Sequence, residues 1–197
     1  MTCAKFESVI GYHCSPVLMG MKPANLVSFS KEKMPELPEI VSDYKEGLER
    51  EGIHMEIICG CRKHYLLLVY RQDMLQEYLE QEEARKLLLQ DGYDINGTLD
   101  EMIAHLKERF FYKTEFPHEI GLFLGYPIED VKGFRRFGGS DCKLCGYWKV
   151  YDDVEQARVI FASYDRCREF TSAQIRQGYS ILQVIGMRHL CTSQMYV

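Results

Sequence analysis

A change in hydrophobic period at Gly52 constrains the fold of this 197-residue chain more than any other feature. Before Gly52, apolar residues recur at near-helical spacing from Pro38 onward: Ile40, Val41, Tyr44 and Leu48. After it, residues 53–58 alternate in the manner of a strand, and the apolar run Tyr65–Tyr70 follows a glycine-bearing turn. This pattern predicts a helix that ends at the glycine and a β-hairpin beyond it. The second strand is apolar on both faces, so we expect it at the centre of a sheet.

The segments around this hairpin have both helical and extended patterns, which predicts the α+β class. Residues 25–29 and 146–151 have the composition of strands. We expect helices over residues 72–91, from the capping box Thr98–Glu101, from Pro117, from Pro127, from Asp152–Asp153, and from Thr171–Ser172 to near Gly186. The length fits a single globular domain over residues 1–197, built on a small mixed sheet, with residues 187–197 as a C-terminal tail.

The composition argues against several classes of protein. Apolar residues make up 46% of the chain and charged residues 27%, as in a globular protein. The net charge of −5, with Glu129 and Asp130 at the start of a predicted helix, argues against nucleic-acid binding. The longest apolar run is too short to cross a bilayer, and residues 1–6 do not form a secretory signal. We therefore expect a cytoplasmic protein, with no membrane contact, whose eight cysteines are mostly reduced.

Three motifs spread over most of the chain are similar to those of one known family. They are His13–Leu26, His118–Phe134 and Gly146–Tyr151, and the most specific is the sequence His-Glu-Ile-Gly-Leu-Phe-Leu-Gly-Tyr-Pro that begins at His118. On these motifs the chain resembles the uncharacterised bacterial family called domain of unknown function 3793, found mainly in anaerobic Gram-positive bacteria. The resemblance implies a single-domain cytosolic protein without an established activity. The resemblance also implies flavodoxin-type gene neighbours, and with them a redox protein as a partner.

Because the resemblance supplies no mechanism, the chemistry has to be sought in the residues. Cys14, His118 and Glu119 are the candidate catalytic residues. A thiolate needs a nearby base or cation, and the base needs an orienting acceptor. The first hypothesis is thus a thiol-dependent enzyme with Cys14 as the nucleophile, His118 as the base and Glu119 as the orienting group. In the alternative, Cys14 is a small buried hydrophobe and His118 makes local hydrogen bonds at a helix start.

Several cations lie beside apolar or aromatic segments and are candidates for binding a small anionic ligand. We assign this role to Lys22, Arg71 and Lys149, together with His13 and Tyr126 as further substrate-binding residues. Arg109 has a similar setting. Salt bridges at strand ends are the structural alternative for each cation. Some of the tyrosines and phenylalanines are expected to line a pocket for a flat ligand, while most of them build the core.

The remaining cysteines suggest a metal or redox site. Cys142 and Cys145 form a C-x-x-C pair, and Cys59 with Cys61 would complete a four-thiolate zinc site if the two segments met. A redox dithiol at Cys142 and Cys145, or two reduced cysteines beside a strand, are the alternatives. His13, His118, Glu119 and Asp130 are a weaker set of transition-metal ligands. The sequence identifies no cofactor and no oligomeric state, so a non-catalytic ligand-, metal- or partner-binding protein is the second functional hypothesis.

Overall fold

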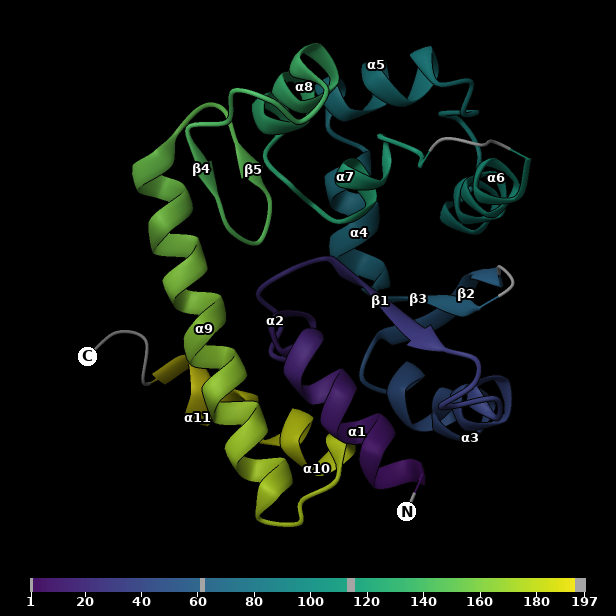
Figure 1. Cartoon of the computed structure of the whole chain (residues 1–197), viewed down its shortest axis with the longest axis vertical. Helices are drawn as coiled ribbons and strands as arrows, with labels where there is room; N and C mark the ends of the chain where they lie inside the picture. The colour runs from purple at the N-terminus through teal and green to yellow at the C-terminus, as the bar shows by residue number, and fades with distance from the viewer. Residues whose placement is uncertain (1, 61–62, 113–115, 194–197) are drawn as a thin grey trace. The chain divides into compact units, whose positions relative to one another are not determined.

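The computed structural model describes residues 2–60, 63–112 and 116–193 and divides into two compact units. Unit 1 comprises residues 1–72 and 163–197, and unit 2 comprises residues 73–162. The elements of both units are labelled in Figure 1. The α+β class predicted from the sequence is confirmed, since both units combine helices with a small sheet. The single-domain organisation stays a prediction.

Unit 1 contains a three-stranded sheet in the order β1-β3-β2. The strands are β1 (Ala24–Ser30), β2 (Ile53–Gly60) and β3 (His64–Arg71). The predicted hairpin and the central place of its second strand are confirmed. Both strand pairs are antiparallel, so this sheet is antiparallel and not mixed as predicted. A bulge between Ile57 and Cys59 shifts the register of β2.

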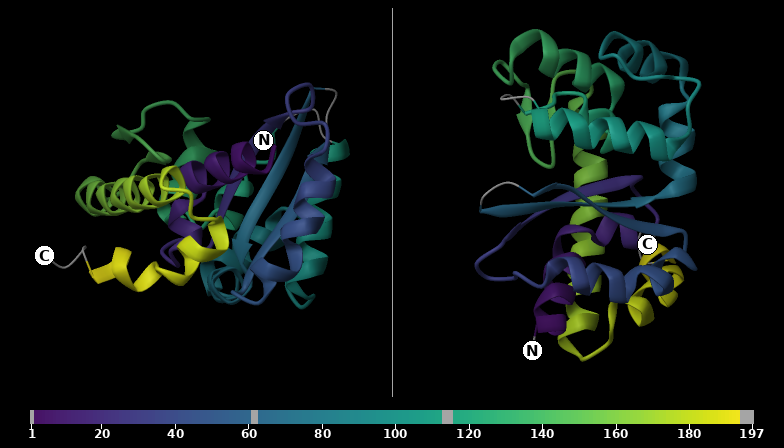
Figure 2. Two further views of the ribbon diagram at one scale, coloured as in Figure 1. Left: turned by 90° about the horizontal axis from the view of Figure 1, so that it is seen from below. Right: turned by 90° about the vertical axis from the view of Figure 1, so that its right-hand side faces the viewer.

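Helices cover the sheet of unit 1 and complete its core. They are α1 (Thr2–His13), α2 (Ser15–Leu18), α3 (Leu37–Glu49), the C-terminal part of α9 (Val154–Arg176), α10 (Ile181–Gly186) and α11 (Arg188–Ser193). In Figure 2, α1 and α3 lie on the same side of the sheet. Leu67 and Val69 of β3 are fully buried in one cluster with Ile10, Leu37 and Ile185. The core of unit 1 is therefore built from both ends of the chain.

Unit 2 contains short helices and a small hairpin. The helices are α4 (Gln72–Leu79), α5 (Glu82–Gln90), α6 (Leu99–Tyr112), α7 (Ile120–Phe123), α8 (Ile128–Phe137) and the beginning of α9. The hairpin consists of β4 (Leu144–Cys145) and β5 (Lys149–Val150), paired antiparallel. Within the described ranges, none of the helices is both long and apolar enough to cross a membrane.

Several predicted boundaries differ from the structure for local reasons. The segment 72–91 forms α4 and α5, because Gln81 has extended backbone angles (φ −58°, ψ 137°). Thr171 and Ser172 lie inside α9, and the next helix begins instead at Ser180, whose hydroxyl accepts a hydrogen bond from the Gln183 N–H. Residues 188–193 of the expected tail form α11, and Cys191 is buried. A polar side chain near the end of a helix pattern therefore does not by itself mark a boundary.

Candidate functional site

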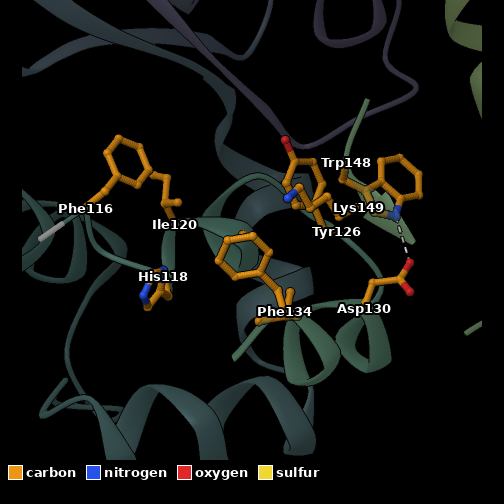
Figure 3. Close-up of a pocket in the computed structure, with 10 residues that line it drawn as sticks. Phe116, His118, Ile120, Tyr126, Asp130, Phe134, Trp148 and Lys149 are labelled. Atoms are coloured by element: carbon orange, nitrogen blue, oxygen red, sulfur yellow. Dashed lines mark hydrogen bonds between the residues drawn. The ribbon is translucent and has the colours of Figure 1, made fainter. Parts of the chain in front are cut away.

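A pocket of about 310 Å³ within unit 2 is the candidate site. Its walls come from α7, α8, the segment before α7 and the start of β5. The residues that line it are Phe116, His118, Ile120, Gly121, Tyr126, Asp130, Val131, Phe134, Trp148 and Lys149 (Figure 3). This volume is at the lower end of the range for small-molecule sites. The lining is mostly apolar and aromatic, with a few polar groups, as such sites usually are.

Asp130 fixes the wall between α8 and the β4–β5 hairpin. Its carboxylate accepts hydrogen bonds from Trp148 Nε1 (2.7 Å) and from the backbone N–H groups of Tyr151 (2.6 Å) and Asp152 (3.0 Å). Asp130 is only 4% exposed. A buried carboxylate needs such donors, because desolvation without them is costly. Asp130 therefore holds Trp148 in place, and a role for it as a metal ligand has to compete with these three donors.

Aromatic rings give the pocket its flat surfaces. Tyr126 stacks on Trp148 with 5.3 Å between ring centroids, and Phe161 contacts the indole edge-on with 4.5 Å between centroids. His118 packs against Phe134 at 5.3 Å. In Figure 3, the Phe134 ring lies between His118 and the group formed by Tyr126, Lys149 and Trp148. Burial raises the pKa of Tyr126 to about 12, so its hydroxyl stays protonated, and it donates to the Tyr147 carbonyl oxygen at 3.3 Å.

Two exposed polar side chains border this apolar space. They are His118, just before α7, and Lys149, in β5. The Lys149 ammonium donates a hydrogen bond to the Gly139 carbonyl oxygen. An ammonium has three N–H donors, so this bond does not exhaust Lys149. The pocket thus combines flat apolar walls with a positive charge, and three residues predicted as site residues line it together: His118, Tyr126 and Lys149.

Glu119 has partners other than the predicted histidine. Its buried carboxylate pairs with the Arg109 guanidinium and accepts a hydrogen bond from the Tyr93 hydroxyl at 3.3 Å. Burial raises the pKa of Tyr93, and the Glu119 carboxylate adds to that shift. These contacts tie the segment before α7 to α6. They give Glu119 and Arg109 a structural role in unit 2.

Cys14 lies in the core of unit 1, whereas His118 and Glu119 belong to unit 2. The Cys14 side chain is fully buried, and burial raises the pKa of its thiol to about 12 although the Lys22 charge opposes the shift. Lys22 is 2% exposed, and burial lowers the pKa of its ammonium to about 8, with Cys14 opposing that shift. Its Nζ lies 6.0 Å from the centre of the Tyr164 ring. This environment favours the neutral thiol of Cys14, which is a poor nucleophile.

Arg71 and His13 also belong to unit 1. The Arg71 guanidinium donates to the carbonyl oxygens of Val17 (2.7 Å), Leu18 (2.8 Å) and Glu51 (3.1 Å). It therefore satisfies carbonyl groups at the end of α2, as a C-terminal cation can. His13 is exposed at the end of α1, and burial of part of the ring, together with Arg168, lowers its pKa. His13 and Cys14 lie where α1 meets α2, not in a strand.

The four candidate zinc ligands do not lie in one unit. Cys59 belongs to unit 1, Cys142 and Cys145 belong to unit 2, and Cys61 lies outside the described residues. No group of three or more His, Cys, Asp or Glu side chains that could hold a metal ion occurs among the residues that the structure describes. Cys145 is exposed in β4, and Cys142 is partly buried just before it. The zinc site and the redox dithiol at these positions stay predictions.

Sequence reasoning missed the aromatic and anchoring residues of the pocket. Phe116, Phe134 and Trp148 were not assigned to the site, and Asp130 was assigned only as a metal ligand. The sequence did offer one signal, because Trp148 and Asp130 lie in two of the three motifs quoted above. Their contact joins residues 18 positions apart, which periodicity does not predict.

The comparisons with known proteins identify a family and no relative of known function. The family model described as "Protein of unknown function (DUF3793)" matches residues 10–185, most of the chain. No curated protein and no solved structure matches the chain.

Proposed function

The chain belongs to the DUF3793 family of proteins of unknown function, and we propose that unit 2 is a binding module for a flat, largely apolar small molecule that carries an anionic group. The observation that carries the proposal is the pocket itself, in which Tyr126, Phe134 and Trp148 surround a space of about 310 Å³. Aromatic faces favour flat ligands through stacking and burial of apolar surface.

The charge of the ligand is argued from the rim of the pocket. Lys149 is exposed in the lining, and a cation beside an apolar surface interacts favourably with a carboxylate, sulfonate or phosphate group. Asp130 is the acidic residue of the lining, but three hydrogen-bond donors occupy its carboxylate. Lys149 and His118 are therefore the side chains of the lining that we expect to make polar contacts with a ligand.

Trp148 is the only tryptophan of the chain, so its fluorescence reports directly on the pocket. We would titrate the protein with anilinonaphthalene sulfonate and, in parallel, with the uncharged phenylnaphthylamine. Saturable quenching of Trp148 by both probes is expected. Phe134→Ala should weaken both probes, because it removes one wall of the pocket.

Lys149→Met distinguishes the anionic part of the proposal from the apolar part. It should weaken the binding of the sulfonate probe about tenfold, which is the equivalent of one charge-assisted hydrogen bond, and leave the affinity for the uncharged probe unchanged. Lys143→Met is the matched control, since Lys143 precedes β4 and is absent from the pocket lining. An absence of saturable quenching would refute the proposal that the pocket binds a ligand. Equal weakening of the binding of both probes by Lys149→Met would refute the proposal that the ligand carries an anionic group.

The thiol-dependent enzyme stays the alternative hypothesis. It requires a reactive Cys14 thiolate with His118 as base, whereas burial raises the Cys14 pKa to about 12 and Glu119 is paired with Arg109. In native protein we expect iodoacetamide to modify the exposed Cys3 and Cys145 and to modify Cys14 only after unfolding. Rapid native labelling of Cys14 at neutral pH, read by peptide mass spectrometry, would favour the enzyme instead. The cytoplasmic location and the redox-protein partner also stay predictions.

A further inference from the structure

Two buried cysteines of unit 1 lie side by side in the part of the chain that the proposed function does not use. Cys167 is in α9 and Cys191 is in α11, 24 positions later. Their Sγ atoms are 3.7 Å apart, and their side chains are 0% and 2% exposed. Met21 Sδ lies 3.0 Å from Cys167 Sγ. Cys167 is thus held between a thioether and a second thiol, while α10 separates the two cysteines in sequence.

The two thiols interact chemically as well as spatially. Hydrogen bonding between them lowers the pKa of Cys191 and raises that of Cys167, and the nearby Arg166 charge favours the thiolate of either residue. In such a pair, the thiol that ionises more easily can attack a disulfide. The other thiol lies close enough to resolve the mixed disulfide that forms.

We propose that Cys167 and Cys191 form a dithiol that converts reversibly to a disulfide linking α9 to α11. The oxidant is a small disulfide of the glutathione class. The Cys191 thiolate attacks one of its sulfurs, forming a mixed disulfide and releasing one small thiol. Cys167 then attacks the Cys191 sulfur and displaces the second small thiol. The two cysteines lose two electrons and two protons in total, and the small disulfide gains them to become two thiols.

Access to the buried pair comes from the short helix that carries Cys191. α11 has six residues, and its residues Arg188, His189 and Leu190 are exposed. A short helix with an exposed face is the kind of element that opens locally without global unfolding. Cys191 is therefore the thiol expected to react first, and closure of the disulfide would then hold α11 on the core of unit 1.

The test is oxidation of the whole native protein by oxidised glutathione, followed by alkylation and digestion with chymotrypsin. We expect a linked pair of peptides, Asp165–Phe170 and Cys191–Tyr196, that disappears on reduction. Cys191→Ser should abolish the linked pair, and Cys3→Ser, at an exposed cysteine in α1, should leave it unchanged. The oxidised protein should also have a higher urea midpoint than the reduced protein, because the bond closes a loop of the unfolded chain.

The wild-type peptide map decides the proposal even if a variant fails to fold. Full alkylation of Cys167 and Cys191 after treatment with oxidised glutathione would overturn it. Linkage of either cysteine mainly to another partner, such as Cys14, would overturn it too. Since this site lies in unit 1 and the ligand pocket lies in unit 2, failure of one proposal leaves the other standing.

Discussion

At the scale of single residues, Asp130 joins α8 to the β4–β5 hairpin and the residues that follow it. Its buried carboxylate receives three N–H donors, from the Trp148 indole and the backbone of Tyr151 and Asp152. Asp130→Ala leaves those donors without their acceptor, so we expect a loss of about 3 kcal/mol in the free energy of unfolding. Urea unfolding followed by Trp148 fluorescence measures it.

Glu129 provides the matched control for Asp130, because it precedes Asp130 in the first turn of α8 and is exposed. It pairs with Lys132 at the surface, and such pairs contribute about 1 kcal/mol or less. Glu129→Ala should therefore change stability little. A similar loss in both variants would mean that the helix start, and not the hydrogen-bond cluster, is what stabilises unit 2.

Lys22 gives stability a defined pH dependence. Burial lowers the pKa of Lys22 from 10.5 to about 8, so between these values the unfolded chain holds a proton that the folded chain has released. The free energy of unfolding then rises with pH, by up to about 1.4 kcal/mol per pH unit. Cys14 acts in the opposite direction above pH 9, because burial raises its pKa from 9.0 to about 12.

Between pH 8 and 9 the unfolded chain has lost only part of the Cys14 proton, so the contribution of Lys22 is the larger of the two. We expect urea unfolding in the presence of reductant to show stability rising with pH in the wild type relative to Lys22→Met, an apolar replacement of similar length. The difference between the two proteins removes the contribution of titrating groups that do not interact with Lys22. Parallel pH profiles would show that Lys22 keeps its ordinary pKa in the folded protein.

At the scale of elements, the start of α6 was predicted from residues that are close together in the sequence. The capping box at the start of α6 is confirmed: the Glu101 N–H donates to Thr98 Oγ1 at 3.3 Å, and the Thr98 N–H donates to Glu101 Oε2 at 2.7 Å. Thr98→Ala should cost about 1 kcal/mol, whereas Thr98→Ser keeps the hydroxyl and should cost much less. Chemical denaturation of the two variants side by side measures the contribution of the cap, and equal losses would contradict it.

Packing between elements was harder to predict, as α8 shows. A side chain at Gly133 would place its Cβ 2.4 Å from Tyr151, so α8 approaches the segment after β5 too closely for any residue larger than glycine. The local sequence around Gly133 does not predict this close contact. Glycine inside a helix usually lowers helical propensity, so the sequence alone gives no reason for it. The close contact is a property of two segments that meet.

At the scale of the whole molecule, the two units differ in how the chain builds them. Unit 2 is continuous from residue 73 to 162, while unit 1 joins residues 1–72 to residues 163–197. The core of unit 1 includes Ile181, Val184 and Ile185 together with Phe6 and Ile10. A fragment of residues 1–72 therefore lacks part of its own core and should not fold cooperatively.

The fragment of residues 73–162 is expected to fold, because its pocket and its Asp130 cluster lie entirely within it. Urea unfolding followed by circular dichroism would compare the two fragments with the full chain, and Trp148 fluorescence adds a second probe for residues 73–162 and for the full chain. A cooperative transition in residues 1–72, or none in residues 73–162, would contradict this division.

The sequence by itself determined the family, the α+β class, the hairpin with its central strand, the first turn of α6 and the start of α8. These depend on hydrophobic period and on residues a few positions apart, which a sequence displays directly. It also indicated His118, Tyr126 and Lys149 as site residues, but grouped them with Cys14, Lys22 and Arg71. Only the tertiary structure decided which side chains are buried and which of them contact one another. Contacts such as Asp130 with Trp148 and Cys167 with Cys191 join distant segments, and the pKa of a side chain such as Cys14 depends on the core that encloses it.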